Sequence, residues 1–110
     1  ARALQELGAT LRGAPANLPF RLDARTLAAG DSFTFSTTLG DFDCLGTPTG
    51  TGGYADLIRN AVDVELSGMT ARVAALDDLI RMKRAAGRAK DLRDVEILGA
   101  LREEIDGDAL

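Results

Sequence analysis

Two segments of this chain alternate between apolar and polar residues, and each leads into a reversal that contains glycine. Alternation with a period of two places the apolar side chains on one face of a strand, and glycine at the reversal permits a tight turn. The pattern predicts two antiparallel hairpins, residues 32–45 turning at Leu39-Gly40 and residues 62–74 turning at Ser67-Gly68. With helical patterns before, between and after them, the hairpins make this an α+β protein.

The segments around the hairpins show helical spacing or short apolar runs. Leucines that recur over residues 4–11 predict an opening helix, which Gly13 ends. A short strand is predicted at Arg21–Ala24 and a short helix at about Tyr54–Asn60. Residues 76–105 are predicted to form a C-terminal pair of helices.

These elements together define the expected architecture. The α+β fold would contain an antiparallel or mixed sheet of two hairpin units packed with helices, followed by a helical C-terminal third. Gly87 marks the break between the last two helices. The length of 110 residues is enough for one hydrophobic core, so residues 1–110 are expected to form a single domain.

Composition excludes several classes of function. The chain contains no histidine, which rules out a Ser-His-Asp triad, a Cys-His pair and any zinc site that needs imidazole. The single cysteine, Cys44, cannot form an internal disulfide. No apolar run approaches the roughly 20 residues of a membrane span. We therefore expect a cytoplasmic protein that does not act in a membrane.

Basic residues are concentrated near the end of a chain whose formal net charge is −4. From Arg81 to Arg93 the sequence has six basic residues and one acid, Asp91, whereas the remainder has nine more acids than bases. This concentration predicts an anion site that attracts phosphate. Lys83 borders the apolar stripe of its helix, and Asp91 is placed to orient it or to accept a proton. The alternative is a solvated helix face with ordinary ion pairs.

Asp41 and Asp43, which we call the acidic pair, lie two residues apart on a predicted strand. Residues with this spacing point to the same face, so the two carboxylates project side by side. Neighbouring carboxylates suit a hard cation such as Mg²⁺, which takes oxygen ligands and keeps several waters. The alternative is that these residues simply solvate a strand end beside a turn.

Several stretches, in this order, resemble a bacterial nucleotidyltransferase: LPFRLD (residues 18–23), GDFDCLG (40–46), GYADL (53–57) and, most clearly, LDDLIRMKRAAGRAKDL (76–92). The sequence is similar to the C-terminal half of minimal nucleotidyltransferases of the DNA polymerase beta superfamily, which include AbiEii-type toxins. The resemblance covers most of residues 18 to 105.

The resemblance implies roles for particular residues. Asp43 would be a catalytic carboxylate that binds the cofactor Mg²⁺, the third metal-binding carboxylate of the family. Asp41 remains a candidate ligand for Mg²⁺ on the ground of its spacing alone. Lys83 would be catalytic and would contact the nucleotide, with Arg88 and Lys90 as further nucleotide-binding residues. Asp91 would complete the catalytic set. The reaction implied is transfer of a nucleotidyl group from a nucleoside triphosphate to an acceptor such as an RNA or a protein, and an antitoxin would be a further partner.

The sequence also departs from the family pattern. Family members carry an Asp-x-Asp pair after a Gly-Gly or Gly-Ser turn upstream of the matching segment, and the first 29 residues here contain none. The chain therefore looks N-terminally incomplete, and we expect it to be inactive or weak alone. Exposed apolar surface and a free strand edge predict self-association. The alternative function is a non-catalytic α+β module that binds a partner or an anion.

Overall fold

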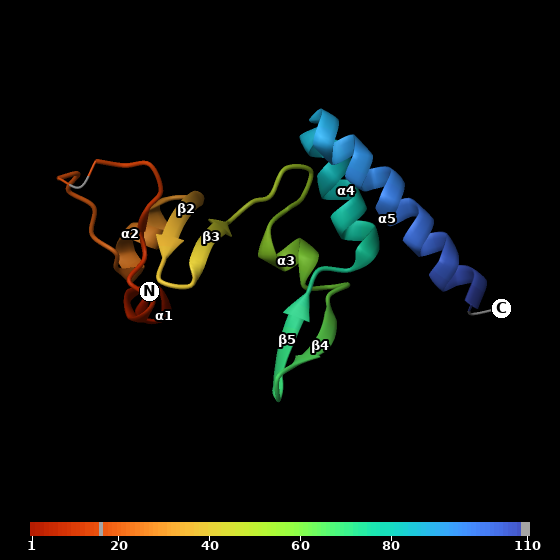
Figure 1. The fold of residues 1–110 in the computed structure, drawn as a ribbon, viewed down its shortest axis with the longest axis horizontal. Helices are drawn as coiled ribbons and strands as arrows, with labels where there is room; N and C mark the ends of the chain where they lie inside the picture. Colours follow the sequence, from red (N-terminus) through yellow and green to blue (C-terminus); the bar gives the residue numbers. More distant parts are fainter. Residues whose placement is uncertain (16, 109–110) are drawn as a thin grey trace. The chain divides into compact units, whose positions relative to one another are not determined.

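The computed structural model describes residues 1–15 and 17–108, and Figure 1 shows their fold. The chain divides into two compact units, Ala1–Thr47 and Pro48–Leu110, and the boundary along the sequence lies in the Gly/Thr-rich loop after the first hairpin. Each unit has its own antiparallel sheet, so the α+β class is confirmed. The elements are α1 (Arg2–Glu6), β1 (Thr10–Leu11), α2 (Ala24–Ala29), β2 (Ser32–Thr37), β3 (Gly40–Leu45), α3 (Tyr54–Leu57), β4 (Val62–Leu66), β5 (Met69–Val73), α4 (Leu76–Ala86) and α5 (Ala89–Asp108).

The first unit is built on a three-stranded sheet in the order β1-β2-β3. β2 and β3 form the first predicted hairpin, with Thr37 paired to Gly40, so the turn lies one residue earlier than expected. Phe35 on β2 is completely buried. Its ring stacks on Phe33 with centroids 5.9 Å apart and lies 6.4 Å from Phe20. This aromatic cluster is the centre of a small core.

Two predictions for the first unit were wrong. The opening helix stops at Glu6 because Gly8 adopts a positive φ of 63°, and Leu11 belongs to β1 instead. Backbone pairing of β1 with β2 thus outweighs the helical spacing of the leucines. No strand forms at Arg21–Ala24: the Asp23 side chain accepts the Thr26 N–H at 2.8 Å and caps α2. The same hydrogen bond lowers the pKa of Asp23.

The second unit contains α3, the β4–β5 hairpin and two longer helices. β4 and β5 pair antiparallel in the predicted register, with Leu66 opposite Met69 across the turn. α4 and α5 lie side by side, joined by only Gly87 and Arg88 (Figure 1). Ile80 on α4 is buried in this unit. In residues 1–15 and 17–108, no helix has the length and apolar content needed to cross a bilayer.

Candidate functional site

The basic segment predicted from the sequence forms the connection between α4 and α5. Gly87 ends α4 in the left-handed conformation, with φ 67° and ψ 8°, and its N–H donates to the Lys83 carbonyl at 3.1 Å. The Arg88 carbonyl then accepts the first hydrogen bond of α5, from the Leu92 N–H at 3.0 Å. A connection of two residues reverses the chain and gathers the basic side chains on either side of it.

Asp91 is the centre of this turn. Its side chain is fully buried, and its Oδ2 accepts the Arg88 backbone N–H at 3.2 Å and Arg88 Nε at 2.6 Å. Arg88 Nη2 also donates to Oδ1 at 3.2 Å. An acid in the third position of a helix that accepts the N–H of the residue before the helix is half of a capping box. Asp91 therefore stabilises the start of α5 and holds the Arg88 guanidinium in place.

Lys83 reaches the same carboxylate from α4. Its Nζ lies 3.6 Å from Asp91 Oδ1 and 3.0 Å from Asp94 Oδ2, and its side chain is mostly buried, with 29% exposed. The hydrogen bond to Asp94 is the main reason that the pKa of Lys83 is raised. The structure thus brings Lys83, Arg88 and Asp91 together, as the sequence predicts. Asp94 is a further member of this cluster that the sequence did not predict. It lies eleven residues beyond Lys83, and the two side chains come into contact only because the turn folds α5 back along α4.

The electrostatics of the cluster keep its groups charged. Hydrogen bonds that the Arg88 side chain donates to Asp91 lower the pKa of Asp91, and the same bonds raise the pKa of Arg88. A carboxylate with a lowered pKa and a full set of donors is a weak base. Of the two roles predicted for Asp91, the geometry therefore favours orienting Lys83 over accepting a proton.

The other basic residues of the segment divide into two groups. Arg81 is neutralised inside the unit, since its Nη2 lies 3.0 Å from Asp56 Oδ2 and 3.0 Å from Asp78 Oδ1. The Asp56 hydrogen bond is the main cause of the raised pKa of Arg81. The remaining three are exposed and form no ion pair with any residue that the structure describes: Arg84, Lys90 and Arg93.

A pocket of about 450 Å³ lies along the same helix pair, between α4 and the second half of α5. Arg102 in its wall lies 3.1 Å from Asp77 and 3.8 Å from Asp106, so much of its charge is already balanced. The pocket presents charges of both signs and does not select for anions. Its charged lining residues are Arg81, Arg84, Arg102, Asp77, Glu103 and Asp106.

The acidic pair lies in the first unit, on β3, and both carboxylates contact one arginine. Arg12 Nη2 lies 2.7 Å from Asp43 Oδ1, and Arg12 Nε lies 3.4 Å from Asp41 Oδ2. Arg12 Nη2 also donates to the Phe35 carbonyl at 2.9 Å, which anchors the guanidinium to the sheet. Arg12 was not predicted as a site residue, because the leucines before it have helical spacing. Only the pairing of β1 with β2 brings Arg12 to the acidic pair.

The acidic pair has the donor chemistry that Mg²⁺ prefers, but it is a small set. In the described part of the chain, no three acidic or cysteine side chains gather as a cation site. Two carboxylates would bind Mg²⁺ only together with water or substrate phosphate oxygens, which is a common arrangement for this ion. A bound Mg²⁺ would have to displace Arg12 from Asp41 and Asp43, because the Arg12 guanidinium forms an ion pair with each of them.

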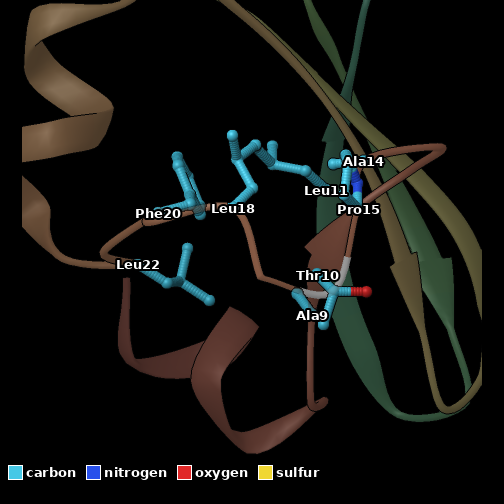
Figure 2. Close-up of a pocket in the computed structure, with 8 residues that line it drawn as sticks. All are labelled: Ala9, Thr10, Leu11, Ala14, Pro15, Leu18, Phe20 and Leu22. Atoms are coloured by element: carbon cyan, nitrogen blue, oxygen red, sulfur yellow. The ribbon is translucent and has the colours of Figure 1, made fainter.

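A second pocket of about 450 Å³ lies in the first unit, between β1 and the segment that leads to α2 (Figure 2). The Leu11, Leu18, Phe20 and Leu22 side chains line it, and Thr10 adds a hydroxyl. None of its described lining residues is charged. It is therefore unsuited to a triphosphate, and none of the predicted site residues lies there.

Comparison with known proteins yields no match to a family model, to a curated protein sequence or to a solved structure.

Proposed function

We propose that this chain is a nucleotidyltransferase-like protein that binds the phosphates of a nucleoside triphosphate at the turn between α4 and α5. The observation that carries the proposal is the convergence of Lys83 and Arg88 on the fully buried Asp91. Two cations fixed by one buried carboxylate are preorganised, so they lose little side-chain entropy when phosphate binds. Asp91 and Asp94 balance the charges of Lys83 and Arg88. The net positive charge that attracts phosphate would therefore come from Arg84, Lys90 and Arg93, which are exposed and form no ion pair with a described residue.

The chemistry would be transfer of a nucleotidyl group to an acceptor such as an RNA or a protein. An acceptor oxygen forms a bond to the α-phosphorus, the bond between the α- and β-phosphates breaks, pyrophosphate leaves, and the acceptor proton passes to solvent. Mg²⁺, when bound, would neutralise phosphate charge. In this proposal Lys83 and Arg88 bind phosphate oxygens, and Asp91 is a positioning residue that orients both cations. The acidic pair is proposed separately as the ligand set for Mg²⁺.

Amide NMR shifts during titration with Mg²⁺ and each of ATP, GTP, CTP and UTP test the proposal. We expect saturable shifts in residues 83–94 that weaken in Lys83→Ala and in Arg88→Ala. Arg25→Ala is the matched control, because Arg25 is exposed, basic and without an ion pair to any described residue. Absence of shifts at millimolar nucleotide, or equal weakening in Arg25→Ala, would overturn the proposal.

The metal role of the acidic pair needs its own variant. Asp43→Asn is expected to abolish the Mg²⁺-dependent amide shifts of β3. Asp63→Asn is the matched control, because Asp63 is also an exposed strand aspartate with an arginine partner, Arg72 at 3.3 Å. Equal Mg²⁺ dependence in the wild type and in Asp43→Asn would show that Asp43 does not bind the ion.

One observation favours a second candidate, a non-catalytic module that binds an anion or a partner. Arg12 already contacts both members of the acidic pair, whereas Arg84, Lys90 and Arg93 are exposed. This module would bind inorganic triphosphate equally well with and without Mg²⁺, and Asp43→Asn would leave the binding unchanged. A requirement for Mg²⁺ separates the enzyme from the module.

A further inference from the structure

The β4–β5 hairpin has one apolar and one polar face. On its polar face, the side chains pair with one another within the hairpin. Arg72 Nε lies 3.3 Å from Asp63 Oδ1, and the Thr70 hydroxyl donates to Glu65 Oε1 at 2.7 Å. The opposite face carries three cross-strand pairs with no polar side chain: Val62 with Val73, Val64 with Ala71 and Leu66 with Met69.

Much of the apolar face is exposed. Met69 is 73% exposed, Leu66 56% and Val62 50%. The sheet has only these two strands, and no third strand from the described residues pairs with either edge (Figure 1). An isolated two-stranded hairpin is marginally stable in water, and further strands stabilise it. The free edges of the hairpin are therefore where a partner would add strands.

The geometry of the turn determines which backbone groups face outward. Ser67 and Gly68 both have positive φ, 50° and 80°, as in a type I′ turn of two residues. In such a hairpin the pair next to the turn exchanges hydrogen bonds, and hydrogen-bonded and non-hydrogen-bonded pairs then alternate. The outward-facing N–H and C=O groups consequently belong to Thr70 and Arg72 on β5, and to Asp63 and Glu65 on β4.

Charge distinguishes the two edges. If β4 paired antiparallel with β4 of a second copy about Val64, Asp63 of each copy would lie opposite Glu65 of the other. Like charges directly opposite one another destabilise a sheet. If β5 paired with β5 of a second copy about Ala71, Arg72 would lie opposite a neutral threonine, Thr70. The β5 edge accepts a second copy without repulsion, whereas the β4 edge rejects one.

We propose that this protein forms a two-fold dimer in which β5 pairs antiparallel with β5 of a second copy, with Ala71 on the axis. The outward groups of Thr70 then meet those of Arg72 of the second copy, and each of these two pairs exchanges two backbone hydrogen bonds. On the apolar face, Met69 of each copy lies beside Val73 of the other, around the small Ala71 pair. The result is a closed four-stranded sheet with negatively charged outer edges, which resist further growth.

The experiment compares two proline variants by sedimentation velocity from micromolar to near-millimolar protein. Thr70→Pro removes the outward N–H of the β5 edge, and Glu65→Pro removes the corresponding group of the β4 edge. Both variants lose the same Thr70–Glu65 hydrogen bond, so they are matched in their effect on the hairpin. Thr70→Pro removes two interface hydrogen bonds per dimer. The loss of each bond raises the dimer Kd about fivefold, so the variant should have a Kd about 25-fold higher or more. Glu65→Pro should leave the Kd unchanged.

Three outcomes would overturn the dimer. A wild-type chain that stays monomeric over the whole concentration range would exclude it. Equal weakening in both variants would indicate head-to-tail pairing of β4 with β5, and weakening in Glu65→Pro alone would indicate the β4 edge.

Disulfide trapping tests the same register without proline. Two cysteines at a non-hydrogen-bonded pair have Cα atoms about 4.5 Å apart, within the range that a disulfide spans. In a Cys44→Ser background, Ala71→Cys should therefore cross-link under mild oxidation, whereas Val64→Cys on the β4 strand should not. Cross-linking of Val64→Cys in preference to Ala71→Cys would refute the proposed register.

Discussion

Replacing Phe35 with alanine should unfold the first unit and leave the helices of the second intact. Phe35 is completely buried and packs against Phe33 and Phe20 at centroid distances of 5.9 and 6.4 Å. Deleting a fully buried phenylalanine side chain costs about 3–5 kcal/mol, because transfer free energy is lost and a cavity remains. A unit of 47 residues, Ala1–Thr47, has a free energy of unfolding of only about 2–7 kcal/mol at typical values per residue. The loss is therefore comparable with the entire stability of the unit.

Amide NMR can follow the two units separately. In Phe35→Ala we expect the signals of β2 and β3 to collapse to random-coil positions at 25 °C, while those of α4 and α5 keep their dispersion. Leu39→Ala is the control, because Leu39 in the β2–β3 turn is 85% exposed and its removal should change stability by less than about 0.5 kcal/mol. The reasoning would be refuted if Phe35→Ala lost less than about 1 kcal/mol, or if α4 and α5 unfolded together with β2 and β3.

Three further predictions concern the site. The lowered pKa of Asp91 adds stability that is present above the ordinary aspartate pKa of 3.8 and is lost as the pH falls through the pKa of the folded state. Between pH 5 and pH 3, the urea midpoint of Asp91→Asn should therefore fall less than that of the wild type. An identical fall would contradict this prediction. Gly87→Ala should destabilise the second unit by about 1–2 kcal/mol, because the φ of Gly87 is 67°. Gly99→Ala inside α5 should stabilise the unit by about 0.5–1 kcal/mol, because a Cβ at this position meets no atom within 4 Å. Stability changes of the same sign in thermal unfolding of the two variants would contradict this prediction. Arg12→Gln should lower the Mg²⁺ Kd at the acidic pair by about two- to tenfold, because the ion no longer has to break one or two exposed ion pairs. The Kd is measured from the amide shifts of β3 during Mg²⁺ titration. The same Kd in the variant and the wild type would show that Arg12 does not compete with the ion.

Elements whose signals are local could be predicted from the sequence. The alternation in residues 32–37 and 62–66 is a property of neighbours two apart, and both hairpins form close to the predicted positions. The two C-terminal helices follow from apolar spacing and from Gly87, which ends α4 with the expected positive φ. The positions of Lys83, Arg88 and Asp91 on either side of that glycine predicted that basic side chains gather near the turn.

Tertiary structure decided the features that depend on contacts between distant parts of the chain. Leu11 has helical spacing from Leu4, yet it lies in β1, because pairing with β2 satisfies backbone groups that a short helix would leave free. That pairing brings Arg12 to the acidic pair, across 31 residues of sequence, and thereby sets what a metal ion would have to displace. The burial of Asp91 and its contact with Lys83 likewise arise only when α5 packs on α4. Residue types and short-range spacing thus determined the candidate groups, whereas long-range pairing determined which charge each of them meets.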